Sequence, residues 1–556
     1  MSINLSRLWL TGFVLVAAIL AGRADAADRS ADEYIEMARE GMQVGEYLAA
    51  ATNFRKAAEA GDSVDIAQQA TRIAFGFGFD DEALKAAERW LKLDKDSEQA
   101  LLYVARLQLR DGRNRASRRS FKRLLKLDDG PAEQRLLSLV QVLADEEPEP
   151  AYEIMQYLAK PYGDSAYANY AVAVMAMSAD DMEEARDRAA LAVEQDPDWL
   201  KAKLLYARAL LLNGSADEAI DYTARIIGDD PDPDPDARLE LALMMMSLDR
   251  NDDALSQVNQ VILEQPSRAD ALRLMAIINF RQQNLDAAQA DFEDLLATRR
   301  YTNDALYYLA RIADFRGEVD SAIRFYAAVS GGGNAVISQR RAAALLAFER
   351  EEPDQAVALL DRFTSDNPGY AIDMVLAKGQ LLTSLERYDD ALVYYDRYVE
   401  FRPDAEGGML GRAELLLRMD RLDDSISQYR AAVKKFPESA TSLNALGYTL
   451  ADRTDKYVEA DKLIRKALEY RPDDPAIIDS MGWVLFRLGE NEEALVWLEK
   501  AYAGFPDPEV AAHIVEVLHA LDRHEEALER LVKAEERDPE NSLLEDVRER
   551  LYPDAE

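Results

Sequence analysis

The chain has 556 residues, of which 48% are hydrophobic, so it has enough apolar surface to fold and is not expected to be disordered. Its net charge of −38 at pH 7 repels nucleic acid and anionic lipid, which argues against a nucleic-acid-binding function. The absence of cysteine excludes thiol nucleophiles, thiolate metal sites and disulfides. Helix formers dominate and β-branched runs are scarce, which predicts an all-α chain.

The first 26 residues have the pattern of a signal peptide. Arg7 gives a short positive start, residues 8–22 form an apolar stretch, and Ala24-Asp25-Ala26 provides a small-x-small cleavage site. We therefore expect residues 1–26 to be removed during export to the periplasm.

The end of this apolar stretch also matches the start of a bacterial lipoprotein processing site. Leu20-Ala21-Gly22 is followed by Arg23, where a lipidated cysteine would stand. Two interpretations stay open: an ordinary signal peptide and a lost lipid anchor. Association with the outer membrane is therefore left undecided by the sequence.

A small residue recurs along the whole chain at intervals of 33, 34 or 35 residues. A helical hairpin needs a small residue where its second helix crosses the first, because the two backbones approach closely there. The spacing therefore predicts fifteen hairpins, with these crossing residues: Ala50, Ala83, Ser117, Ala151, Ala185, Ala219, Ala254, Ala288, Ala322, Ala356, Ala391, Ser425, Ala460, Ala494 and Ala527.

Proline supports the same period independently. With 19 prolines in 556 residues, chance would place about half a proline at fifteen positions. Nine prolines stand twelve residues after a crossing residue, where the second helix must stop. They are Pro197, Pro231, Pro266, Pro368, Pro403, Pro437, Pro472, Pro506 and Pro539.

Two further positions complete the expected packing. Twelve residues before the crossing residue, the first helix usually carries another small residue: Ala38, Ala105, Ala173, Ala207, Ala242, Ala276, Ala310, Ala344, Gly379, Ala413 and Gly482, with Gly447 displaced by a one-residue insertion. Four residues after it stand large side chains that we expect in the core: Phe54, Phe121, Phe292, Tyr326, Tyr395 and Tyr429.

This pattern resembles the tetratricopeptide repeat family from about residue 30 to residue 541. The resemblance implies an all-α, right-handed superhelical solenoid of about fifteen hairpins, whose first helices line a concave groove. Residues 27–541 would form the array and residues 542–556 a C-terminal capping helix and tail. The expected function is a non-catalytic scaffold that binds other proteins.

Two segments stand out from the regular array. The hairpin around Ala151 is degenerate, with residues 146–150 reading E-E-P-E-P, and a bend or subdomain boundary is one interpretation. Residues 106–126 carry nine basic residues against a single acidic one, on an otherwise acidic chain. Arg106 and Arg110 are expected to face the groove. Four residues are expected outward, either as a second patch for an acidic partner or as a solvated helix face: Arg119, Lys122, Arg123 and Lys126.

No pattern in the sequence signals catalysis or a cofactor. The only histidines, His513, His519 and His524, lack metal-ligand spacing, and neither H-E-x-x-H nor G-x-S-x-G occurs. We therefore expect no enzyme activity, no metal and no bound cofactor.

The last three hairpins carry a more particular resemblance. Residues 443–454 read L-N-A-L-G-Y-T-L-A-D-R-T, residues 479–489 read D-S-M-G-W-V-L-F-R-L-G, and residues 509–513 read E-V-A-A-H. This trio is similar to proteobacterial tetratricopeptide lipoproteins that act as adaptors of a periplasmic carboxyl-terminal processing protease. The resemblance implies an adaptor that holds the protease while it degrades peptidoglycan cross-link hydrolases. Assembly scaffolds for envelope or exopolysaccharide machinery carry similar sequences, so that function is the alternative.

The same three hairpins supply the predicted partner site. Two positions on the inner face of each first helix combine aromatic with hydrogen-bonding side chains, which is typical of a binding hot spot. The alternative is that the aromatics only pack adjacent hairpins together. The residues are Asn444, Tyr448, Asp479, Trp483, His513 and Glu516.

The signal-peptide interpretation predicts one cleavage position. Expression in a Gram-negative host should give a periplasmic protein whose first residue is Ala27, as determined by N-terminal sequencing. An intact Met1, or partition of the protein into detergent phase, would contradict this prediction.

Overall fold

The computed structural model describes residues 29–127, 130–230 and 232–553. The signal-peptide prediction, including Arg23 and the cleavage position, lies outside these residues. Within them the chain is all-helical, with fifteen antiparallel hairpins followed by one more helix. None of the helices in these ranges is long and apolar enough to cross a membrane.

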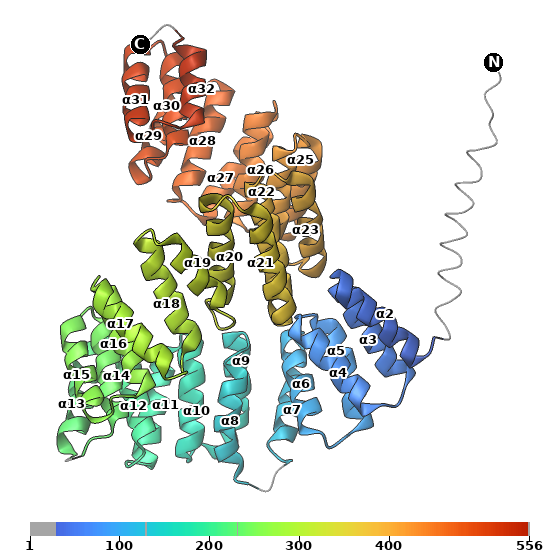
Figure 1. The fold of residues 1–556 in the computed structure, drawn as a ribbon, viewed down its shortest axis with the longest axis vertical. Coiled ribbons are helices and arrows are strands. Elements are labelled where there is room, and N and C mark those ends of the chain that lie inside the picture. Colours follow the sequence, from blue (N-terminus) through green and yellow to red (C-terminus); the bar gives the residue numbers. More distant parts are fainter. Residues whose placement is uncertain (1–28, 128–129, 231, 554–556) are drawn as a thin grey trace. The chain divides into compact units, whose positions relative to one another are not determined.

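The chain divides into two compact units, of which unit 1 ends at Ala371 and unit 2 begins at Ile372 (Figure 1). The ten hairpins of unit 1 are α2 (Ala31–Val44) with α3 (Tyr47–Ala60), α4 (Val64–Gly76) with α5 (Asp80–Leu93), α6 (Glu98–Arg110) with α7 (Asn114–Leu124), α8 (Ala132–Leu143) with α9 (Pro148–Ala159), α10 (Ala166–Ser178) with α11 (Met182–Gln195), α12 (Leu200–Leu212) with α13 (Ala216–Asp229), α14 (Pro235–Ser247) with α15 (Asn251–Glu264), α16 (Ala269–Arg281) with α17 (Leu285–Ala297), α18 (Thr302–Phe315) with α19 (Val319–Ala328), and α20 (Ala335–Ala344) with α21 (Pro353–Asp366).

Unit 2 has five hairpins and a last helix, α32, that packs against α30. Its elements are α22 (Ala371–Ser384) with α23 (Tyr388–Phe401), α24 (Glu406–Arg418) with α25 (Leu422–Lys435), α26 (Ala440–Arg453) with α27 (Tyr457–Tyr470), α28 (Pro475–Leu488) with α29 (Asn491–Gly504), α30 (Pro508–Ala520) with α31 (His524–Arg537), and α32 (Ser542–Leu551).

The predicted crossing residues hold every hairpin together. All fifteen have a relative exposure of 0%. At the two serine positions the hydroxyl finds a partner across the crossing: Ser117 Oγ donates to the carbonyl of Ala105 at 2.9 Å, and Ser425 Oγ to that of Ala413 at 2.7 Å. These bonds join the two small positions that the sequence places twelve residues apart, so the register is confirmed.

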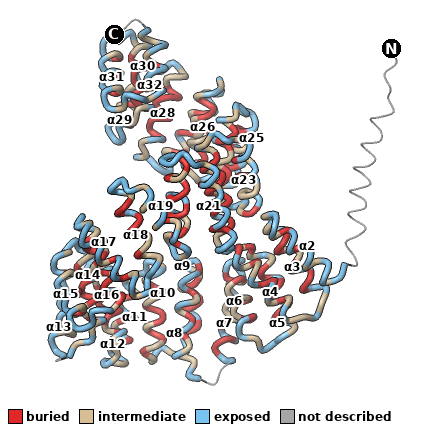
Figure 2. The backbone as a smooth tube through the Cα atoms, in the orientation of Figure 1, coloured by how far each residue is buried: buried red, intermediate tan, exposed pale blue. Residues whose placement is uncertain are grey.

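Helix ends follow the prolines. Nine second helices in the described residues end two positions before a predicted proline, as α11 does at Gln195 before Pro197 and α31 at Arg537 before Pro539. The expected core aromatics are also buried, from Phe121 and Phe292 at 0% to Tyr429 at 5% exposure. Figure 2 shows the resulting pattern in unit 1, where α14 and α16 are largely buried while α13 and α15 are exposed along much of their length.

One predicted small position on a first helix is wrong. Ala344, twelve residues before the crossing residue Ala356, is only partly buried, and the neighbouring Ala342 and Ala343 are buried instead, at 0% and 1% exposure. Helix α20 changes here into a π-helical segment, Leu345–Glu349, in which the wider turn rotates the following residues around the helix axis. The repeat period counts residues only, so it could not predict the change of helix pitch at the end of α20.

The turn inside the hairpin has a repeated backbone feature that the period did not reveal. In thirteen of the described hairpins, the residue five positions before the crossing residue has a positive φ of 56–86°, as in Gly45 and Gly489. Non-glycine residues such as Asp180 and Asp420 occupy the same conformation in other hairpins, at a cost of about 1 kcal/mol. The two hairpins without it are those around Ala151 and Ala460, where the sequence is degenerate or one residue longer.

The closeness of the crossings predicts opposite effects for two identical substitutions in unit 2. A Cβ atom at Gly482 would lie 2.6 Å from Leu498 Cγ and 3.1 Å from the carbonyl oxygen of Ala494, whereas one at Gly407 would meet nothing within 4 Å. Gly482→Ala should therefore destabilise the protein, because about 1–3 kcal/mol of overpacking exceeds the gain of about 1 kcal/mol from helix propensity.

Gly407→Ala is the matched control, since it gains the helix propensity of alanine without the clash. Chemical denaturation of both variants should move their midpoints in opposite directions relative to the wild type. Stabilisation by both substitutions would show that the helices at Gly482 cross at a greater distance than described.

Candidate partner-binding grooves

An apolar groove of unit 2 lies across its last hairpins and has a volume of about 460 Å³. First helices α24, α26, α28 and α30 supply most of its wall, joined by Tyr429 of α25 and the turn between α29 and α30. The lining residues are Glu414, Leu417, Tyr429, Asn444, Ala445, Tyr448, Thr449, Pro475, Ala476, Asp479, Ser480, Phe505, Asp507, Glu509 and Val510.

Three of the six predicted site residues line this groove: Asn444, Tyr448 and Asp479. The hydroxyl of Tyr448 donates a hydrogen bond to Glu509 Oε1 at 2.5 Å, which links α26 to α30. Burial raises the pKa of Tyr448, and the charge of Glu509 raises it further, so the phenol stays neutral and remains a donor.

Trp483 and His513 are not exposed in the groove, so for Trp483 the structure supports the alternative that the ring packs adjacent hairpins together. Each residue is only 6% exposed, and the two rings stack with centroids 4.1 Å apart at an angle of 20°. His513 Nδ1 donates to Asp479 Oδ1 at 3.0 Å. The next first helix covers this part of α28, so both rings join α28 to α30 and stand behind the groove wall rather than in it.

Glu516, the sixth predicted residue, is half-buried and does not line the groove. Its carboxylate forms an ion pair with Arg550 of α32 at 2.7 Å. From the sequence we expected α32 only to cap the stack. The ion pair between this helix and Glu516, a predicted binding residue, was not predicted.

The environment of His513 favours its charged form. Burial alone would lower the pKa of His513, but the charge and hydrogen bond of Asp479, with the nearby carboxylates of Glu509 and Glu516, outweigh burial and raise it. A charged imidazole here compensates Asp479, which would otherwise be a buried carboxylate without a counter-charge.

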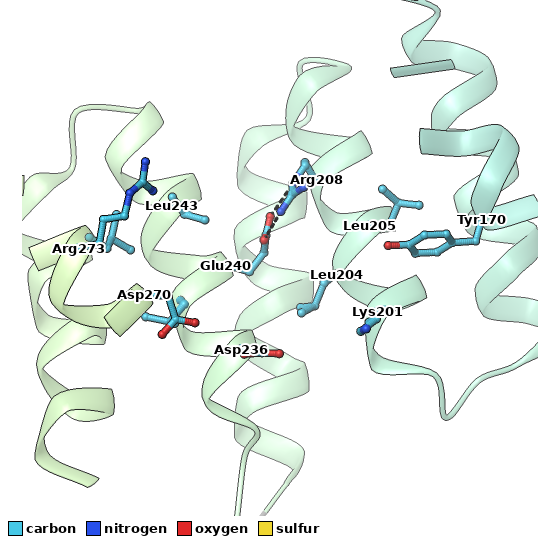
Figure 3. Close-up of a pocket in the computed structure, with 12 residues that line it drawn as sticks. Tyr170, Lys201, Leu204, Leu205, Arg208, Asp236, Glu240, Leu243, Asp270 and Arg273 are labelled. Atoms are coloured by element: carbon cyan, nitrogen blue, oxygen red, sulfur yellow. Dashed lines mark hydrogen bonds and ion pairs between the residues drawn. The ribbon is translucent and has the colours of Figure 1, made fainter. Parts of the chain in front are cut away.

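A second groove, which the sequence analysis missed, lies on unit 1 and has a volume of about 300 Å³ (Figure 3). It is lined by first helices only, α10, α12, α14 and α16. Figure 3 shows Arg208 reaching the buried Glu240 on the neighbouring helix, with an Nε–Oε1 distance of 2.8 Å. Arg273, at the other end of this groove, pairs with Asp304 at 2.6 Å.

The two grooves differ in charge. The unit 1 groove is lined by three carboxylates and three basic side chains: Asp236, Glu240, Asp270, Lys201, Arg208 and Arg273. Two of these carboxylates, Asp236 and Asp270, also pair with Arg268. In the unit 2 groove the four carboxylates are not matched by any lysine or arginine among the lining residues: Glu414, Asp479, Asp507 and Glu509.

The predicted basic patch on α7 is exposed, and its partners lie within unit 1. Arg119, Lys122, Arg123 and Lys126 are exposed, as expected. Arg123 donates to the carbonyl of Lys95, and Lys122 Nζ lies 5.9 Å from the centroid of the Tyr157 ring. These contacts leave open both the partner patch and the solvated face.

Arg106 and Arg110, which were expected to face the groove, are held by an acidic side chain of unit 1. Both bind the carboxylate of Glu146, through Nε–Oε distances of 2.5 and 2.6 Å. The Glu146 side chain is 1% exposed. It occupies the turn position that has a positive φ in the regular hairpins, so two ion pairs hold the turn of the degenerate hairpin.

The described ranges contain no group of three or more His, Asp or Glu side chains arranged to hold a metal ion. His519 and His524 have their Nδ1 atoms 3.2 Å apart, and His519 also contacts the hydroxyl of Tyr552 at 3.3 Å.

Comparisons with known families agree with the geometry of the hairpins. One tetratricopeptide repeat model matches residues 210–278, and a second matches residues 176–237, 273–335, 341–406 and 410–476, so that the two together cover more than half of the chain. The chain belongs to the tetratricopeptide repeat family. Members of this family generally bind protein partners, and the fold described above is that of an all-α repeat solenoid within each unit.

Similar proteins include a TPR repeat-containing protein of Pseudomonas aeruginosa, PA4667, which is 34% identical over 214 residues, or 38% of this chain. The chain spans only 36% of that relative's length. Among solved structures, a thermophilic TPR protein of Thermus thermophilus, TTC0263, is 23% identical with a TM-score of 0.30, over 33% of this chain and 97% of its own. The APC/C hetero-tetramer Cut9–Hcn1 is 14% identical with a TM-score of 0.35, over 97% and 99% of the two chains.

The His513–Asp479 pair predicts a pH-dependent contribution to stability. Because the folded-state pKa of His513 is raised above its ordinary value of 6.5, the stabilisation is fully present below that value. It is lost as the pH rises through the higher folded-state pKa. His513→Gln should cost about 1–3 kcal/mol at about pH 6 and clearly less at about pH 9.

Thermal unfolding followed by circular dichroism at constant ionic strength measures both differences. His524→Gln, at an exposed histidine in the neighbouring helix, is the control for general effects of the substitution. A His513→Gln penalty that stays constant or grows with pH would contradict the charged pair.

Proposed function

We propose that the chain is a periplasmic scaffold that acts as an adaptor for a carboxyl-terminal processing protease. In this role it would hold the protease while the protease degrades peptidoglycan cross-link hydrolases. Membership of the tetratricopeptide repeat family supports protein binding in general, and the sequence of the last three hairpins supports the particular partner.

The proposal rests mainly on one observation: the segments that resemble the adaptor proteins lie on helices that line the apolar groove of unit 2. The three segments that resemble the adaptor proteins, residues 443–454, 479–489 and 509–513, lie on α26, α28 and α30. These helices supply Tyr448, Asp479 and Glu509 to the apolar groove of unit 2. A sequence pattern that distinguishes these hairpins from the other repeats therefore gathers at one surface suited to a partner.

The chemistry of this groove favours binding over catalysis. The hydroxyl of Tyr448 is bonded to Glu509, and the imidazole of His513 is buried against Asp479. Both groups therefore connect first helices of different hairpins. A general base or nucleophile needs a reacting group within hydrogen-bond reach and access for the substrate, which the buried imidazole lacks.

The test uses purified proteins. The mature chain, residues 27–556, is mixed with an inactive variant of the carboxyl-terminal processing protease from the same genome, and the mixture is analysed by size-exclusion chromatography with light scattering. We expect a complex whose mass exceeds that of either protein. We also expect the active protease to degrade a purified cross-link hydrolase faster when the chain is present.

An unrelated protein of similar size and net negative charge serves as the control for non-specific electrostatic attraction. Separate elution of the two proteins, together with an unchanged rate of hydrolase degradation, would overturn the proposal. Recovery of polysaccharide-synthesis proteins by the immobilised chain would then favour an assembly scaffold.

A further inference from the structure

We propose that the groove of unit 2 binds an extended segment of a partner protein in which a lysine or arginine stands next to a bulky apolar residue. This inference rests on the proposed protein-binding function and names the chemistry of the segment that is bound. Three properties of the groove carry it: an exposed apolar surface, a lining with four carboxylates but no lysine or arginine, and a predominance of hydrogen-bond acceptors.

The apolar surface includes a side chain that other residues leave uncovered. Phe505, in the turn between α29 and α30, is 59% exposed and lines the groove beside Val510. Leu417 and Tyr448 supply further partly buried apolar surface. Exposed aromatic surface next to a concave apolar wall is favourable for an apolar side chain of a partner, since both lose contact with water on binding.

The carboxylates of the groove favour a basic residue next to the apolar residue of the bound segment. Glu414 and Glu509 are exposed at opposite parts of the groove, on α24 and α30, and Asp479 and Asp507 lie between and beside them. Two of these carboxylates have a basic partner outside the lining: Glu414 pairs with Arg418 at 2.9 Å, and Asp479 pairs with His513 at 3.0 Å. Asp507 and Glu509 form no ion pair in the described part of the chain. An acidic segment would meet like charge here, whereas a cation would gain attraction from several carboxylates.

The hydrogen-bonding groups of the groove also favour a lysine or arginine in the bound segment. Lysine and arginine side chains only donate, and the groove mainly offers acceptors. Glu509 accepts from Tyr448 through one oxygen atom, Oε1, and its second oxygen can accept from a ligand.

The groove of unit 1 shows why the inference concerns unit 2 alone. In unit 1 Glu240 is paired with Arg208, and Asp236 and Asp270 are paired with Arg268, so the three carboxylates of that groove have internal counter-charges. Lys201 also lines that groove and would repel an incoming cation. The same architecture therefore gives one groove whose lining is balanced in charge and one whose lining contains no lysine or arginine.

The test selects ligands without assuming their sequence. A phage-displayed library of random dodecapeptides is panned against the full mature chain and against Glu414→Gln/Glu509→Gln. The double variant removes two charges, and the amide oxygen at position 509 can still accept from Tyr448. Glu492→Gln/Glu493→Gln is the matched control, because both glutamates are exposed on α29 and do not line the groove. Circular dichroism of all three proteins verifies that they are folded.

We expect the wild type and the control to enrich peptides with lysine or arginine beside an aromatic or large aliphatic residue. A synthetic copy of the most enriched peptide should bind the groove variant at least tenfold more weakly by fluorescence anisotropy. The same peptide with its basic residues replaced by glutamine should lose binding to the wild type to a similar extent.

Enrichment of neutral or acidic peptides, equal binding by the groove variant, or no enrichment at all would overturn this inference. The outcome is separable from that of the adaptor proposal. If the protease binds the groove variant and the wild type equally, the adaptor function stands and the groove assignment fails. If the peptide binds as expected while the protease does not, the groove assignment stands and the particular partner is wrong.

Discussion

The close crossing of two helices at one small side chain determines the rest of the structure. Each hairpin depends on a residue with no side chain larger than that of alanine or serine at the point of contact, and all fifteen of these residues are fully buried. Where the opposite position is glycine, as at Gly447 and Gly482, the facing side chain already occupies the place of a Cβ atom. The crossing fixes the distance between the two helices, and stacking the hairpins then places successive first helices side by side.

This arrangement has a consequence for function. Side chains on the first helices of neighbouring hairpins lie next to each other although they are about 34 residues apart in the sequence. Tyr448 and Glu509, two hairpins apart, are joined by a hydrogen bond, and Asp479 and His513 pair across adjacent hairpins. The groove of unit 2 is therefore a composite of several hairpins, so that its specificity depends on combinations of residues. Some side chains of this groove are constrained because they pack the helices together. The other lining residues determine the charge of the groove.

Much of the fold could be predicted from the sequence because the crossing needs particular residue types at a fixed period. Alanine and serine mark the crossings in the sequence, and proline marks the ends of the second helices. The helix ends before Pro197 and Pro539 were therefore predictable. The π-helical segment at Leu345–Glu349 could not be predicted, because it changes helix pitch without a distinctive residue. Glu146 shows another limit: its partners Arg106 and Arg110 are 40 and 36 residues away and have no fixed spacing in the repeat.

The candidate site was predicted only in part, for a related reason. The repeat register places Trp483 and His513 on the inner face of their helices, but it does not say how far the next hairpin covers them. It also omits turn residues such as Phe505, whose side chain reaches the groove from outside the helical period. Burial of one helix by the next depends on side chains from three hairpins at once, so it needs the assembled structure.

Contact between the groove of unit 2 and the partner protein can be measured by site-specific photocrosslinking. A benzophenone amino acid is placed at Phe505, which lines this groove, or at Phe315, which is 80% exposed on unit 1 and lines neither groove. Each form of the chain is irradiated with the purified processing protease, and the products are mapped by mass spectrometry. If the groove of unit 2 binds the protease, we expect an adduct from position 505 and none from position 315. The adduct should lie on a protease segment that contains lysine or arginine. An adduct from position 315 alone, or equal adducts from both positions, would contradict this expectation.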